Sequence, residues 1–159
     1  MPDPRPKSER EWHRKMAAKE FNLVWSLLEK KRRTADDDDR MIHAAHSSRF
    51  HWGIVGTPVH LVIGEWQISH VYAVLKRPEP SLYHAERCLA VCRRHGVGDF
   101  PLAFAYEALA RAAAVAGDAT ARDRYLVRAR RAGDRIHETE DREQFFADLK
   151  TIPRVRRRR

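Results

Sequence analysis

The clearest indication of the fold class lies in residues 107–129, EALARAAAVAGDATARDRYLVRA. Small and apolar side chains recur every three or four positions on both sides of Gly117, which is the spacing of one helical face. Glycine is a residue type that ends helices, and Asp118 directly after it is a residue type that begins them. The stretch therefore predicts two helices joined by a tight turn.

The rest of the chain consists of similar periodic segments separated by Gly, Pro or Asp. Apolar side chains at helical spacing predict an all-α protein of seven helices with no strand. The expected helices cover residues 8–31, 37–52, 58–75, 80–95, 99–116, 118–136 and 140–149. We expect a disordered arm at 1–8, one helical domain at 9–150 and a basic disordered tail at 151–159.

Composition limits the classes of function. The chain has 159 residues, 43% of them hydrophobic, which is enough for one domain with its own core. No apolar run approaches the roughly 20 residues of a membrane span, and the first residues lack the apolar segment of a secretory signal. Cys88 and Cys92 are the only cysteines, too few for a disulfide framework. We therefore expect a cytoplasmic protein that does not contact a membrane.

The net charge of +9 is concentrated near the C-terminus. Five arginines lie within residues 152–159, so the rest of the chain carries only +4. A charge of this size is ordinary for a folded domain. The tail could contact phosphate groups, but no recognition helix or RNA-binding motif accompanies it. Nucleic acid is therefore not the expected partner.

The helical segments repeat with a period of about 41 residues, so that Ser69 and Tyr72 correspond to Ala110 and Ala113. A fixed period of about 20–50 residues is typical of helical solenoids. Within 107–129, small residues, an aromatic residue and Gly-Asp at the turn follow the tetratricopeptide pattern. On these residues the chain resembles the tetratricopeptide-repeat superfamily. The resemblance implies an α-α superhelix of three hairpins, at about 9–54, 58–96 and 100–137, with a capping helix at 140–150.

The same resemblance implies which side chains line the concave face of the superhelix. Trp25, Trp66 and Glu107 occupy equivalent positions in successive repeats. With His70 and Arg111 they would supply the apolar anchors and charges that a peptide-binding groove requires. The expected function is a non-catalytic scaffold that binds a protein or peptide partner. Two alternatives stay open: that the tryptophans pack as core between repeats, and that an end helix forms a homodimer.

A second functional hypothesis rests on the histidines of MIHAAHSSRFHW, residues 41–52. His43 and His46 are three residues apart and can share a helical face. Glu65 is expected beside this face on the following helix. Two imidazoles and a carboxylate can hold zinc or iron. This alternative is a small metal-dependent enzyme or metal-binding protein, and it competes with the interpretation that the histidines only pack and that no cofactor is bound.

Overall fold

The computed structural model describes residues 8–157, and within that range its regular structure is entirely α-helical. The helices are α1 (Glu9–Leu28), α2 (Ala35–Val55), α3 (Pro58–Val74), α4 (Pro78–His95), α5 (Asp99–Val115), α6 (Ala119–Gly133) and α7 (Thr139–Leu149). Each coincides with a segment predicted from the sequence, so the prediction of an all-α protein is confirmed. None of these helices is both long and apolar enough to cross a membrane. Of the arm expected at 1–8, all but Ser8 lies outside the described residues.

Local hydrogen bonds explain the short, charged connection between α1 and α2. The Thr34 hydroxyl accepts a hydrogen bond from the Asp37 backbone N–H at 3.1 Å, and the Asp37 carboxylate accepts one from the Thr34 backbone N–H at 3.0 Å. This reciprocal pair is a capping box, which satisfies two backbone donors at the start of α2. Lys30 donates to the same carboxylate at 2.6 Å. The basic and acidic blocks at 30–39 therefore stabilise the turn between the helices.

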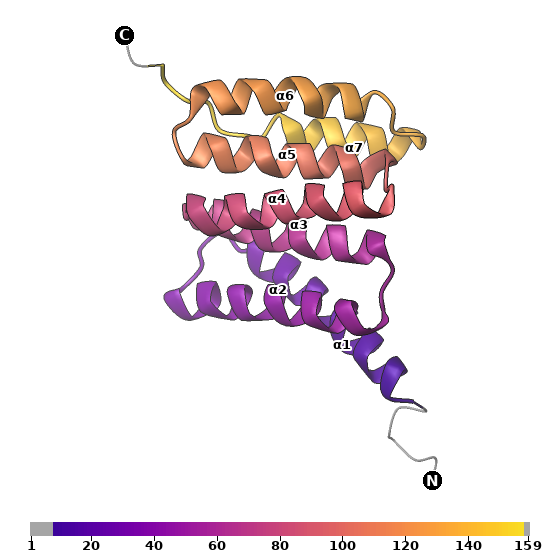
Figure 1. The fold of residues 1–159 in the computed structure, drawn as a ribbon. Coiled ribbons are helices and arrows are strands. Elements are labelled where there is room, and N and C mark those ends of the chain that lie inside the picture. The colour runs from indigo at the N-terminus through magenta and orange to yellow at the C-terminus, as the bar shows by residue number, and fades with distance from the viewer. Residues whose placement is uncertain (1–7, 158–159) are drawn as a thin grey trace.

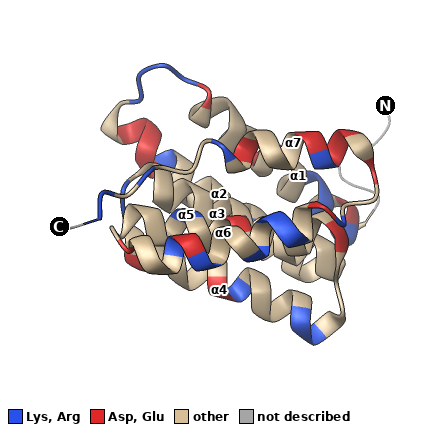
Figure 2. Cartoon of the chain, turned by 90° about the horizontal axis from the view of Figure 1, so that it is seen from above, with Lys and Arg blue, Asp and Glu red and all other residues tan. Residues whose placement is uncertain are grey.

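The helices pair in chain order, α1 with α2, α3 with α4 and α5 with α6, and the pairs lie in layers (Figure 1). α3 also contacts α2 and α5, and α4 contacts α5, so that neighbouring layers are joined. α7 packs against α5 and α6 on the side of the stack opposite to α4 (Figure 2). We call the α7 side the inner face and the α4 side the outer face.

The hydrophobic core runs through all the layers as three clusters of buried side chains. One, around Met41 and Ile68, joins α1, α2 and α3. The next, around Val62 and Cys88, joins α3, α4 and α5. The last is centred on Phe145, which α7 inserts against α5 and α6. Burying apolar surface between the layers is what holds the helices together.

The segment after α7 is expected from the sequence to be disordered. In the structure, residues 151–157 lie along α5 and α6. Ile152 is buried in the same cluster as Phe145, and Val155 packs against that cluster. Arg122 on α6 donates to the Pro153 carbonyl at 2.7 Å. The C-terminal segment therefore extends the inner face, and the last two residues of the predicted tail lie outside the described range.

Candidate functional site

A row of α3 side chains forms the centre of the inner face. Its members recur at intervals of three and four residues, which places them on one side of the helix. The row spans about 21 Å at 1.5 Å per residue. Its members are Val59, Ile63, Trp66, His70 and Ala73.

The N-terminal end of this row borders a hollow of about 180 Å³ between α1, α2 and α3, which we call the apolar hollow. Trp52 forms one wall and stacks on His60 with ring centroids 4.1 Å apart. Val59, at 38% exposure, is open to solvent at its edge. The surroundings are almost entirely apolar, so the hollow suits an aliphatic or aromatic side chain. Its lining residues are Ala18, Phe21, Asn22, Trp52, Val59, His60 and Ile63.

Three rings meet in the middle of the row, and we call them the aromatic centre. Trp25 of α1 lies 5.8 Å from Trp66 of α3, and His70 stacks on Trp66 at 5.0 Å between ring centroids. Trp25 and His70 are half-buried, whereas Trp66 is only 6% exposed. Partly exposed tryptophan and histidine rings can pack against an apolar or aromatic group. The accessible part of the centre is therefore Trp25 with His70.

A buried ion pair lies directly behind the aromatic centre. Glu107 has no exposed surface; it accepts a hydrogen bond from Trp66 Nε1 at 2.7 Å and one from Arg111 Nε at 2.8 Å. Arg111, 8% exposed, also donates to the Thr151 hydroxyl at 2.7 Å and to the Asp148 carbonyl at 3.1 Å. Burial raises the pKa of Glu107, although the charge of Arg111 opposes this shift. The pair fixes Trp66 and ties α7 to α5.

The other end of the row opens into a hollow of about 400 Å³, which we call the basic hollow. The Lys76 side chain is exposed at its rim and forms no ion pair with the described residues. Apolar side chains of α3 and α5 form most of the remaining wall. An apolar cavity with a free ammonium at its edge suits a group that ends in a carboxylate. Its lining residues are Ala73, Val74, Lys76, Arg111, Val115 and Pro153.

Burial gives His70 an unusual protonation behaviour. Burial and, to a smaller extent, the nearby charge of Arg111 together lower the pKa of His70 to about 3. The ring is therefore neutral at physiological pH. Its Nδ1 is buried and has no hydrogen-bond partner among the described residues. An unsatisfied buried polar atom costs about 1–3 kcal/mol of stability, so this site carries an energetic penalty within the fold.

The five residues predicted for the groove do come together on the inner side, but they are not equally accessible. Trp25 and His70 can touch a partner. Glu107 cannot, because it is fully buried, and Trp66 and Arg111 expose little surface. The reason is that α7 and the following segment cover the inner side of α5. The sequence predicts all five as contacts, but it gives no sign of the apolar hollow or of Lys76 at the basic hollow, because both hollows form only when the helices pack.

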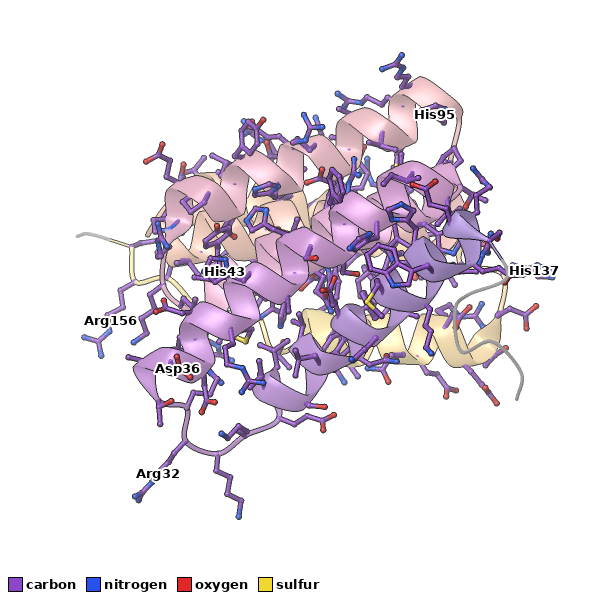
Figure 3. The ribbon with its side chains drawn as sticks, turned by 90° about the horizontal axis from the view of Figure 1, so that it is seen from below. Arg32, Asp36, His43, His95, His137 and Arg156 are labelled. Atoms are coloured by element: carbon purple, nitrogen blue, oxygen red, sulfur yellow. The ribbon has the colours of Figure 1, made fainter. Side chains whose placement is uncertain are left out.

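The three predicted metal ligands do not converge. His43 lies exposed on α2 (Figure 3) and borders a shallow hollow with Glu20 and Arg40. His46 shares a hydrogen bond with the Tyr72 hydroxyl at 2.9 Å. Neither histidine forms a hydrogen bond or ion pair with the Glu65 carboxylate, although the His46 ring lies 5.3 Å from the ring of His84, which does. In the range 8–157 no group of three or more His, Cys, Asp or Glu side chains is arranged to hold a metal ion.

Glu65 is instead the hub of a network that joins α2, α3 and α4. At 3% exposure, it accepts hydrogen bonds from Arg49 Nε and Arg87 Nε, both at 3.1 Å, and from His84 Nδ1 at 2.6 Å. Burial raises the pKa of Glu65, but the hydrogen bonds from His84 and Arg87 and the charge of Arg49 outweigh it, so the pKa is lowered. A carboxylate already neutralised by two guanidinium groups is poorly suited to bind a cation.

Glycine at position 64 lets this network form. A Cβ at Gly64 would lie 2.8 Å from Arg49 Cδ, which is closer than carbon atoms normally approach. The missing side chain allows Arg49 of α2 to lie flat against α3 and reach Glu65. The signal present in the sequence was the buried charge itself, since a Glu in an apolar helix requires partners. The partners Arg49, His84 and Arg87 could not be identified without the packing of the helices.

Neither thiol is suited to nucleophilic chemistry. Both Cys88 and Cys92 are free and buried. Burial raises the pKa of Cys92 to about 11 and that of Cys88 well above its usual value. The reactive thiolate form is therefore scarce at neutral pH.

No family model matches the chain, and the comparisons with curated proteins and with solved structures found no similar protein.

Proposed function

We propose that this protein is a non-catalytic scaffold that binds a peptide segment of a protein partner along the inner face of α3. The observation that carries the proposal is the α3 row from Val59 to Ala73, with partly exposed rings at its centre and a hollow at each end. Apolar and aromatic linings with a few convergent polar groups are usual for binding sites.

The lining of the row defines the chemistry of the peptide. The apolar hollow takes an aliphatic or aromatic side chain, and the surface formed by Trp25 and His70 supports a second apolar residue. The basic hollow, with Lys76 at its rim, takes an acidic side chain or a C-terminal carboxylate. A row of about 21 Å matches six or seven residues of an extended peptide at about 3.3 Å each. The peptide is therefore short, apolar over most of its length and acidic at one end.

We further propose that the helix pairs form a tetratricopeptide-like superhelix, which would make the inner face concave. Support comes from the repeat period: Trp66 and Glu107 are 41 residues apart and directly hydrogen-bonded, and Trp25 precedes Trp66 by the same interval. In the second hairpin the Ser69 hydroxyl donates to the Ser81 carbonyl at 2.8 Å, and the Ser81 hydroxyl donates to the Ser69 carbonyl at 2.9 Å. Small residues at both positions allow the close helix approach that such a hairpin needs.

Peptide display tests the proposed function without a known partner. The immobilised protein is offered a library of random peptides, and each enriched peptide is titrated by isothermal calorimetry. We expect enriched peptides to combine apolar residues with one terminal acidic group. Trp25→Ala should weaken their binding by about 10-fold or more, since central aromatic residues dominate binding energy.

Trp12→Ala is the matched control for Trp25→Ala. Trp12 lies on the same helix, is 41% exposed and makes edge-to-face contacts with His13 and His51, and it lines neither of the two hollows. This variant should bind every selected peptide as the unmodified protein does. The proposal is wrong if no peptide is enriched, or if the selected peptides bind Trp25→Ala as tightly as the unmodified protein.

A further inference from the structure

A row of arginines follows one side of α6 and continues past its end. Arg124, Arg128 and Arg131 are spaced by four and three residues, which places them on one face of α6, and Arg135 follows two residues after the helix ends at Gly133. All four are exposed, and none forms an ion pair with another residue in the range 8–157. The row spans about 16 Å. Figure 2 shows basic residues along α6 and at the end of α4.

The ordinary stabilising roles of surface arginines do not account for this row. Cations in the last turn of a helix interact favourably with its dipole, which explains Arg131. The Arg124 guanidinium lies over the Tyr125 ring at 5.1 Å, whereas neither effect accounts for Arg128 in the middle of α6. The one acidic residue within α6, Asp123, is already paired with Arg122 and Arg157. Like charges four residues apart on a helix repel each other. The row therefore carries unpaired positive charge that a bound anion would neutralise.

A hollow of about 490 Å³ lies beside this row, between α6 and the start of α5. Three arginines of the row line it together with Tyr106 and with Asp99, whose carboxylate accepts a hydrogen bond from the His137 backbone N–H at 3.2 Å. Arg128 also borders a second hollow, which reaches Tyr125 and Arg93 on α4. The positive surface thus continues toward the end of α4, where His95 lies (Figure 3). Aromatic side chains next to unpaired cations are typical of surfaces that bind single-stranded nucleic acid.

We propose that this surface binds single-stranded nucleic acid. The arginine row contacts successive phosphates, and one base enters the hollow beside Tyr106. A single strand is favoured over a duplex because its bases are free to enter a hollow, whereas paired bases are stacked inside the helix. The sequence-based expectation against nucleic acid rested on the net charge of the tail and of the rest of the chain and on the lack of a known motif, and a net charge does not show how arginines group on the folded domain. The inference does not depend on peptide binding at the inner face.

Fluorescence anisotropy with labelled oligothymidylate and oligouridylate of about twelve nucleotides tests the proposal. The variant Arg128→Gln/Arg131→Gln/Arg135→Gln should bind about 10-fold or more weakly at 0.1 M salt. Each lost phosphate contact lowers the slope of log K against log salt by about 0.7 for single strands, so the slope should fall by about 2. Because the substitutions relieve repulsion, the variant should unfold at the same temperature as the unmodified protein or higher.

A second triple variant, Arg10→Gln/Lys19→Gln/Arg32→Gln, removes the same charge from exposed positions of the first hairpin. It should bind within about threefold of the unmodified protein, which separates a defined surface from general attraction to a basic protein. Tyr106→Leu should weaken binding about 10-fold while keeping the salt slope, since it removes stacking and no charge. Equal losses in the two triple variants would overturn the proposal, as would a duplex of the same length binding as tightly as the single strand.

Discussion

Replacing Arg111 by methionine tests the buried ion pair behind the aromatic centre. The Glu107 carboxylate has no exposed surface and relies on Arg111 for its counter-charge. Arg111→Met leaves that carboxylate buried and unpaired and removes the hydrogen bonds to Thr151 and to the Asp148 carbonyl. Breaking a buried ion pair in this way costs about 3–5 kcal/mol. We expect the free energy of unfolding at pH 7 to fall by that amount.

The double variant Glu107→Leu/Arg111→Met separates the cost of the unpaired charge from the cost of lost packing. It removes both charges and leaves Trp66 Nε1 without an acceptor, which costs about 1–3 kcal/mol, while the hydrogen bonds to Thr151 and Asp148 are lost in both variants. The double variant should therefore be more stable than Arg111→Met alone. Urea unfolding followed by far-ultraviolet circular dichroism measures both free energies.

The pH dependence of Arg111→Met provides an independent check. Burial raises the pKa of Glu107 above its usual value of 4.5, and the loss of Arg111 removes an opposing effect. The folded variant therefore takes up a proton at a higher pH than the unfolded chain does, and its destabilisation should shrink as the pH falls from 7 to 5. A cost of less than about 1 kcal/mol for Arg111→Met would contradict a buried ion pair between Arg111 and Glu107. A double variant less stable than Arg111→Met would contradict it as well.

Three further predictions concern stability. His70→Phe should flatten the pH dependence of the unfolding free energy. The pKa of His70 is about 3 in the folded protein, against a usual value of 6.5. Between these two pH values His70 therefore lowers the free energy of unfolding by up to about 1.4 kcal/mol for each unit by which the pH falls. Urea titrations from pH 7 to pH 4 measure that slope, and equal slopes in the two proteins would contradict the placement of His70. Glu65→Gln should cost about 1–3 kcal/mol at pH 7. Because the pKa of Glu65 is lowered from 4.5, this difference should disappear as the pH falls below 4.5, and a constant difference down to pH 3 would refute the hydrogen-bond network. Gly133→Ala should lower the free energy of unfolding by about 1–3 kcal/mol, because its Cβ would collide with Phe145 of α7. Thermal unfolding tests this, and an unchanged midpoint would mean that α7 does not pack there.

The helices could be predicted from the sequence because the signals are local. Apolar spacing and terminal residues such as Gly117 and Asp118 determine where a helix begins and ends, whatever surrounds it. The period of 41 residues carried further information, since it aligned Trp25, Trp66 and Glu107 across successive layers. These three side chains form a continuous column in the structure.

The accessible surface could not be predicted in the same way, because it depends on contacts between distant segments. Phe145 marks an apolar side of α7, but nothing in its spacing says that α7 covers α5 and buries Glu107. The partners of Glu65 come from two other helices. The sequence predicts His46 beside Glu65, whereas the structure places Arg49 and His84 against its carboxylate. The arginine row on α6 can be detected in the sequence by its helical spacing. The net charge, which is dominated by the tail, does not reveal this grouping.

An amide chemical-shift map shows which face of the protein a peptide binds. Isotope-labelled protein is titrated with a selected peptide, and the shift of each backbone amide is followed by nuclear magnetic resonance. Binding along the inner face of α3 predicts the largest changes at Ile63, His70 and Val74 and at the indole of Trp25. Changes confined to the outer face, around Arg87 and Arg128, would contradict the account.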